Sequence, residues 1–313
     1  MAVEPMDAID QSMVLTESVA PVTTDDGEVL GRGRLIWRRF KRRRSAMIAL
    51  GFLVFMFALA FIGPHFIQWD YQEIDANAFL SPPSAQHWFG TTQIGQDVFA
   101  QTLRGLQKSL VIGLMVGIIS TSIAAVVGAT AGYFGGVVER VNLFMVSLLL
   151  VLPDFLIIAI ISPRLKGQSW LWFVLLLSIF SWTLTAMVVH SLTLSLRSRE
   201  YVNAARYMGV PARTVISRHI LPNMASFLII DATISVSAAI LLESGLSYFG
   251  FGIQPPDVSL GTLIAQGTSS AFTYPWLFAF SGGILVAIVL TVNIIGDALR
   301  DAIDPASTSR AAL

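Results

Sequence analysis

The sequence has 313 residues, of which 54% are hydrophobic and 13% are charged, and its mean hydropathy is +0.69. It is far more apolar than a soluble domain, which predicts a protein of the membrane. The formal net charge is zero and cysteine is absent. Without thiols, a disulfide framework, an iron–sulfur cluster and thiolate zinc sites are excluded.

The start of the chain separates acidic from basic residues. Residues 1–30 carry seven acidic side chains and no lysine or arginine, which is typical of a disordered tail. Eight basic residues follow between Arg32 and Arg44. We interpret this basic run as a positive-inside anchor that holds the N-terminus in the cytoplasm and meets anionic headgroups, in preference to a nucleic-acid patch. Residues 1–44 are thus expected to form a cytoplasmic tail.

Six apolar segments follow, each long enough to cross a ~30 Å hydrocarbon core at about 1.5 Å per residue. They are expected at 45–69, 109–138, 141–161, 169–191, 225–246 and 276–295. The predicted fold class is an all-α membrane protein of six transmembrane helices with both termini cytoplasmic. A five-span alternative would need 109–161 to cross once, which its length forbids.

The same count divides the rest of the chain. Residues 70–108 contain acidic residues before any basic one and are expected outside. Residues 109–299 are expected to form a five-helix core that contains a cytoplasmic loop at 192–224, and 300–313 a cytoplasmic tail. Five arginines in that loop support its position inside.

The second apolar segment has two basic residues at one end and three glycines within it. Arg104 and Lys108 lie at its outer end against the charge rule, where they could extend to the headgroups. Gly113, Gly117 and Gly128 could allow close packing against a partner subunit, or be ordinary membrane glycines.

Ionisable residues inside the apolar segments are candidates for function, because a charge at the bilayer centre costs at least ~2.5 kcal/mol. Asp154, Asp231 and Glu243 are therefore candidate translocation-path residues, and His190 also lies in an apolar segment. The alternative for each acid is a hydrogen bond within the bundle. Asp231 and Glu243 should lie ~18 Å apart along one helix and cannot form one carboxylate pair.

Enzyme motifs are missing from the sequence. It contains no GxxxxGK[ST], HExxH or GxSxG pattern, and its four histidines are scattered. We therefore expect no catalytic, cofactor-binding or metal-binding residues. A transporter of this kind must take its energy from an ion gradient or from a separate ATPase.

The stretch 203–222 is the most informative part of the chain. Ser198 as a cap, Glu200 in the first turn, and the Gly209 to Pro211 break predict a short helix followed by a second one over 212–220. Helical spacing places Val202, Ala205 and Met208 on one face. An opposite face is predicted for Arg199, Asn203 and Arg206. Amphipathicity alone favours an ordinary cytoplasmic loop that its arginines keep inside.

The residue pattern of this loop resembles the EAA loop of ABC importer permeases, the element that docks on the ATP-hydrolysing subunit. TyrValAsnAlaAlaArg at 201–206, Gly209 and HisIleLeuProAsn at 219–223 are similar to the peptide permease branch. The family glutamate is replaced by Asn203. Further blocks in family order lie at 90–97, 132–136, 243–252 and 296–305, although Thr92 and Gln96 stand where the family usually has an acid and a base.

The resemblance implies a C-type permease subunit of a dipeptide or oligopeptide importer in the bacterial plasma membrane, with the type I permease fold and cytoplasmic coupling helices. It implies as partners a second homologous permease, two ATPase subunits that bind ATP and Mg²⁺, an extracytoplasmic peptide-binding protein and the lipid bilayer. Nucleic acid is not expected as a partner. The implied coupling residues are Tyr201, Asn203, Ala204, Ala205, Arg206, Gly209, His219, Leu221 and Pro222.

Two alternatives to a peptide importer stay open. Importers of nickel, glutathione or other small solutes share these permease signatures. An ion-coupled secondary transporter that uses Asp154, Asp231 or Glu243 is the alternative from another class.

Overall fold

The computed structural model describes residues 32–165 and 169–303, and within these the regular structure is helical. The only β pairing among the described residues is two isolated β-bridges, Ile74 with Gln96 and Thr91 with Asp97. The helices are α1 (Arg32–Arg42), α2 (Arg44–Ile62), α3 (Val98–Phe134), α4 (Gly136–Val151), α5 (Asp154–Ile161), α6 (Leu171–Ser181), α7 (Thr183–Arg197), α8 (Glu200–Tyr207), α9 (Ala212–Val215), α10 (Ala225–Tyr248), α11 (Leu260–Thr268) and α12 (Trp276–Ile303).

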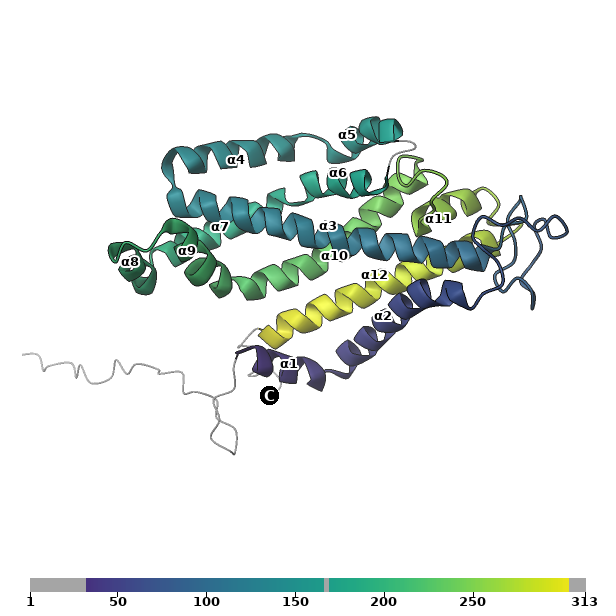
Figure 1. Ribbon diagram of the computed structural model, residues 1–313, viewed down its shortest axis with the longest axis horizontal. Helices are drawn as coiled ribbons and strands as arrows, with labels where there is room; N and C mark the ends of the chain where they lie inside the picture. Colours follow the sequence, from purple (N-terminus) through teal and green to yellow (C-terminus); the bar gives the residue numbers. More distant parts are fainter. Residues whose placement is uncertain (1–31, 166–168, 304–313) are drawn as a thin grey trace, which may run out of the picture.

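The long helices run side by side as a bundle (Figure 1). Four of them, α2 with the turn after it, α3, α10 and α12, are long and apolar enough to cross a membrane. The pairs α4–α5 and α6–α7 qualify only if each bent pair counts as one span, with bends of 76° and 46°. The described residues therefore supply four to six candidate spans.

The break in the third predicted segment has a local cause. Leu152 and Pro153 adopt extended conformations between α4 and α5. A proline lacks the N–H that an α-helix needs and its ring collides with the preceding turn, so the helix ends before it. The break between α6 and α7 falls at Trp182, which has no such signal in the sequence.

The boundaries of α3 differ from the prediction at both ends. The helix begins at Val98 instead of Ser109, because the Asp97 side chain accepts a hydrogen bond from the Ala100 N–H at 2.7 Å and caps the first turn. At the other end, Gly135 and Gly136 turn the chain with φ of +68° and +57°. Glu139 and Arg140, which separate the predicted segments 109–138 and 141–161, both lie within α4.

Helix α3 lies at the centre of the bundle and touches two neighbours through glycines (Figure 1). A Cβ added at Gly113 or Gly117 would lie within 3.2 Å of atoms of Val236 in α10. One added at Gly128 would lie 2.5 Å from the carbonyl oxygen of Ala186 in α7. In this structure the three glycines that the sequence offered for a partner subunit serve close packing inside the chain.

The bundle has two ends of different character, which we name by their residues. The loop end carries residues 66–97 and α11, and the hairpin end carries α1, α8 and α9 (Figure 1). In the loop end, His87 is buried between two carboxylates, with Nδ1 2.8 Å from Asp97 Oδ2 and Nε2 3.4 Å from Asp75 Oδ2. The Asn77 N–H, together with His87, holds the pKa of Asp75 below its usual range. These contacts tie residues 75–87 to the start of α3.

We expect Gly128→Ala to lower the melting temperature of the purified chain in detergent. The added methyl group meets the Ala186 backbone, and such overpacking costs ~1–3 kcal/mol. Gly245→Ala is the matched control, since a Cβ there meets nothing within 4 Å and alanine favours a helix by about 1 kcal/mol over glycine. Equal melting temperatures for the two variants would contradict the close contact of α3 with α7.

Candidate functional site

The segment between α7 and α10 folds into a helical hairpin, residues 198–223, at the hairpin end (Figure 1). Helix α8 is followed by α9, by a π-helical turn over Ile216–Ile220 and by a 3₁₀ turn over Leu221–Asn223. The second helix predicted over 212–220 is thus present, with its later half wound as a π-helix. The 3₁₀ turn leads directly into α10.

The ends of α8 are set by backbone conformation and not by a side-chain cap. Ser198 was predicted to cap it, but its hydroxyl donates to the Ser195 carbonyl at 2.8 Å, at the end of α7, and Arg199 occupies the cap position without a side-chain bond. The helix ends at Tyr207, and Gly209, two residues later, has a φ of +76° and donates its N–H to the Arg206 carbonyl. Pro211 then occupies the N-cap position of α9.

One face of α8 is buried in the bundle. Val202 and Ala205 pack in an apolar cluster with Ala129 of α3 and Val189 of α7. Burial of a valine side chain stabilises such a contact by ~1.5 kcal/mol or more. Met208, predicted on the same face, is 75% exposed because the helical repeat stops at Tyr207. The hairpin is therefore fixed to the ends of α3 and α7.

Polar contacts strengthen this attachment. The Arg197 Nη1 donates to the carbonyl oxygens of Gly132 and Tyr133 at 3.2 Å, where the last carbonyls of α3 lack helical partners. The Arg206 guanidinium lies 5.7 Å from the Tyr133 ring centre. Asn203 donates from Nδ2 to the Ser198 carbonyl at 3.3 Å. An ionised glutamate at this position has no donor and could not make this hydrogen bond to the Ser198 carbonyl.

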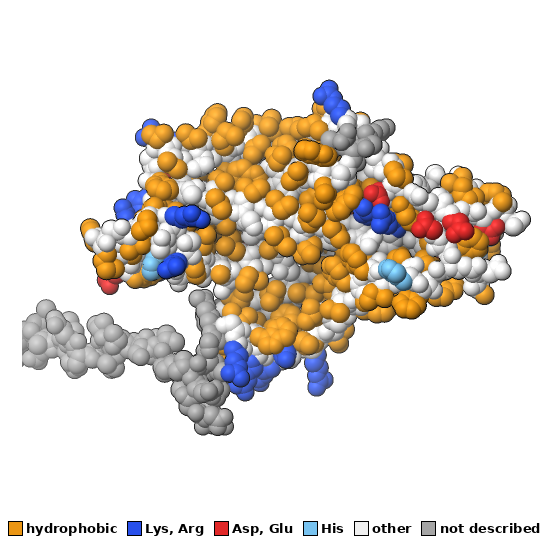
Figure 2. All heavy atoms as spheres, in the orientation of Figure 1, with side chains coloured by type: hydrophobic (Ala, Val, Ile, Leu, Met, Phe, Trp, Pro, Cys, Tyr) orange, Lys and Arg blue, Asp and Glu red, His pale blue; other side chains and the backbone are white. Residues whose placement is uncertain are grey.

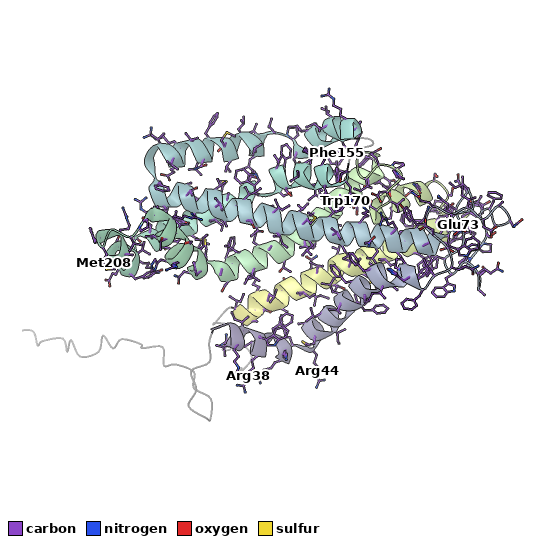
Figure 3. All side chains as sticks on the ribbon, viewed as in Figure 1. Arg38, Arg44, Glu73, Phe155, Trp170 and Met208 are labelled. Atoms are coloured by element: carbon purple, nitrogen blue, oxygen red, sulfur yellow. The ribbon has the colours of Figure 1, made fainter. Side chains whose placement is uncertain are left out.

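The opposite face of α8 is open. Tyr201, Ala204, Tyr207 and Met208 are exposed, with Tyr207 at 91%, and Met208 lies at the tip of the hairpin (Figure 3). Tyr207 was not among the predicted coupling residues, although its spacing of three from Ala204 indicates a neighbouring position on the helix surface. Of the nine predicted residues, the exposed ones are Tyr201, Ala204, Arg206, Gly209 and Pro222, the half-buried ones are Asn203, His219 and Leu221, and Ala205 is buried.

The two acids of α10 are engaged by hydroxyl groups. Asp231 accepts hydrogen bonds from Thr121 of α3 at 2.9 Å and from Thr185 of α7 at 2.8 Å. Each bond joins α10 to another helix. Asp231 therefore cross-links three helices, as its bundle alternative predicted.

Glu243 has no exposed surface and accepts from Ser247 at 2.6 Å and from Ser109 of α3 at 3.3 Å. Asp154 is exposed at the start of α5, where it accepts the Phe155 N–H at 2.7 Å. The three predicted path acids thus lie in separate hydrogen-bond groups. The described residues contain no group of three or more His, Cys, Asp or Glu that could hold a metal ion.

A fourth acid was not among the predicted residues. Asp257, in the loop between α10 and α11, lies 2.8 Å from Arg104 Nη2 and 3.0 Å from Lys108 Nζ. Lys108 also lies 4.5 Å from the Trp170 ring centre. Burial alone would raise the pKa of Asp257, but the adjacent Lys108 and Arg104 hold it below its usual range. Both cations thus have a carboxylate partner inside the loop end, which the sequence analysis did not anticipate.

The loop end also contains a cavity of about 360 Å³. Its lining is uncharged and mixes polar with apolar side chains, which come from residues 92–96, α3, α11 and α12. The residues are Thr92, Gln93, Ile94, Gln96, Val98, Gln101, Leu263, Gln266, Gly267, Ser269, Leu277 and Ser281.

Comparison with known proteins assigns the chain to a family. Residues 124–309 match the model of the binding-protein-dependent transport system inner membrane component family, and residues 31–83 match the N-terminal transmembrane domain of oligopeptide transport permease C. The chain belongs to this permease family. The first match contains the whole hairpin and the second contains α1 and α2.

Full-length relatives agree with this assignment. The oligopeptide transport system permease protein OppC of Mycobacterium tuberculosis is 53% identical over 283 residues, which cover 90% of this chain and 97% of the relative. A putative peptide permease protein of Brucella suis is 35% identical over 85% of this chain and 89% of its own length. OppC of Haemophilus influenzae is 34% identical over 87% of this chain and 89% of its own length.

We expect Asp257→Asn to destabilise the permease by ~2 kcal/mol, because it leaves the buried Lys108 without a carboxylate. Adding Lys108→Met should recover part of the loss. Since the pKa of Asp257 is lowered by folding, its contribution is complete above pH ~4 and disappears as the pH falls through the folded-state value. Melting temperatures between pH 3 and 7 check both effects, and equal losses in the single and double variants would contradict the pair.

Proposed function

We propose that this chain is the C-type permease subunit of an ATP-driven importer of dipeptides or oligopeptides in a bacterial plasma membrane. Membership of the permease family and the names of its relatives support this function. The observation that carries the coupling role is the hairpin of residues 198–223, which has one face fixed to the bundle and an exposed apolar tip at Tyr207 and Met208.

The proposed topology is six spans with the hairpin end and both termini in the cytoplasm. The charges of the described residues support this orientation. Basic residues 34–44 and the arginines of the 198–223 hairpin lie at the hairpin end, and Asp70, Glu73 and Asp75 lie at the loop end. Positive charge on the cytoplasmic side is the rule for such loops.

In the proposed complex, this chain pairs with a second homologous permease and two ATPase subunits, which bind ATP and Mg²⁺. An extracytoplasmic peptide-binding protein delivers the substrate at the loop end. Closure of the ATPase dimer would move α8, and the cluster around Val202 and Ala205 would pass that movement to α3 and α7. The neighbouring Met224 belongs to the same cluster and leads into α10, so the bundle would switch between two states.

Two alternatives to an ATP-driven peptide importer, another solute and an ion-coupled mechanism, are less well supported. Nickel, glutathione or another small solute would use the same coupling surface, and the relatives' names favour peptides. An ion-coupled transporter needs a carboxylate that is free to exchange its ion. The hydroxyl groups bound to Asp231 and Glu243 favour structural roles for both.

A crosslinking experiment tests the contact directly. Because the chain has no cysteine, Tyr207→Cys introduces a unique thiol at the tip of the hairpin. We expect it to crosslink to an ATPase subunit in the assembled complex, and Phe272→Cys, exposed in the loop end, should not. No crosslink from Tyr207→Cys would contradict the docking surface.

Removing the bulk of the tip should uncouple transport from ATP hydrolysis. The double variant Tyr207→Ala and Met208→Ala is expected to reduce peptide uptake at least ~tenfold, since exposed large side chains of this kind supply ~2 kcal/mol each at protein interfaces. Tyr207→Phe with Met208→Leu keeps the bulk and should retain uptake. Uptake by vesicles that contain the whole complex is the measurement, and equal uptake by both variants would contradict the role of the tip.

Gly209 should be sensitive to backbone conformation and not to size. A Cβ there meets nothing within 4 Å, yet its φ of +76° is unfavourable for residues other than glycine and asparagine. We expect Gly209→Val to lower uptake and Gly209→Asn to preserve most of it, with normal membrane insertion in both. The opposite order would show that the left-handed turn is not what positions α8.

A further inference from the structure

Helix α1 presents two different faces. Phe40, only 2% exposed, packs with Ala298 and Ala302 of α12, so one face is committed to the bundle. The remaining surface is basic and α1 contains no acidic residue. Exposed cations are Arg38, Lys41, Arg42 and, in the first turn of α2, Arg44.

The position of α1 is that of a helix at a membrane surface. The chain bends at Arg43, which is extended, and the apolar α2 begins at the next residue. Arg43 also binds Asp301 of α12 at 2.5 Å, which fixes the bend. A basic amphipathic helix beside the end of a span lies in the headgroup region.

An aromatic side chain completes this surface. Trp37 is 47% exposed, stacks on Phe40 with ring centres 5.7 Å apart, and has Lys41 Nζ 5.1 Å from its ring centre. Tryptophan is enriched at the membrane interface because its ring is apolar and its N–H is polar. It would anchor α1 at the depth of the headgroups.

The figures show how the cations are placed. Arg38 and Arg44 point away from the bundle (Figure 3), and blue side chains gather at the edge formed by α1 (Figure 2). Acidic side chains are not near them in that view, since the red ones lie mainly at the loop end. Asp297 and Asp301 of α12 also lie at this end, and Asp301 binds Arg43, but the basic residues outnumber them. The surface therefore has an excess of positive charge.

We propose that α1 and the first turn of α2 form a binding surface for anionic phospholipid headgroups, selective for phosphatidylglycerol over phosphatidylcholine. Each basic residue near an anionic surface contributes ~1 kcal/mol, and the surface has at least four. This surface lies apart from the α8 tip, and its lipid selectivity does not depend on peptide transport.

The test uses the full chain in phosphatidylcholine nanodiscs and measures association of fluorescent phosphatidylglycerol, with fluorescent phosphatidylcholine as reference. Replacing Arg38, Lys41 and Arg42 together with glutamine should lower the selectivity ~tenfold or more. The matched control, Arg38→Lys with Lys41→Arg and Arg42→Lys, keeps the charge and should keep the selectivity. Raising the salt from 0.1 to 1 M should weaken binding to the native chain, since the Debye length falls from ~10 to ~3 Å.

Two results with the variants would overturn the proposal, and so would one with a competitor. One is unchanged selectivity in the glutamine variant when its melting temperature equals that of the control. The other is loss of selectivity in the charge-conserving control as well, which would mean that the side-chain shapes matter and the charge does not. Displacement of the labelled lipid by glycerol phosphate would assign the surface to a soluble phosphate and would also contradict it.

Discussion

The close contact of α3 with α7 and α10 is the constraint on which the rest of the bundle depends. Gly113 and Gly117 bring the backbone of α10 against α3, and Gly128 and Gly132 do the same for α7. At such distances a methyl group has no room, so the relative placement of the three helices is fixed by backbone shape. Helix packing without side chains between the axes is how membrane helices gain dispersion contacts when lipid offers no hydrophobic driving force.

This contact explains where the 198–223 hairpin lies. The hairpin connects α7 with α10, and both of these helices are held on α3. Arg197 then binds the last carbonyls of α3, while Val202 and Ala205 fill the space between its end and α7. A displacement of α8 by a partner would therefore act on three helices together, which suits an element that must turn a local push into a change of the whole bundle.

The buried acids also hold other segments of the chain against α3. Asp231 and Glu243 both reach hydroxyl groups of α3, and Asp257 reaches two cations of the same helix. A buried carboxylate without partners would be costly, and here each one joins segments that are far apart in the sequence. The polar side chains within this apolar chain thus reinforce the packing that the glycines permit.

The sequence by itself determined the class of the protein, the six apolar segments, the short helix that stops before Gly209 and the family to which the chain belongs. These depend on composition, on hydrophobic length and on local signals such as glycine and proline, which act within a few residues. The start of α3 at Val98 is also local, because Asp97 caps it, although the apolar pattern alone did not place it there. Only the tertiary structure decided that α6 and α7 are separate helices, that Arg104 and Lys108 bind Asp257, that Met208 is exposed, and that the α3 glycines face α10 and α7. Each of these depends on atoms far apart in the sequence or on where a helix stops, and no pattern along the chain records which distant surface a side chain will meet.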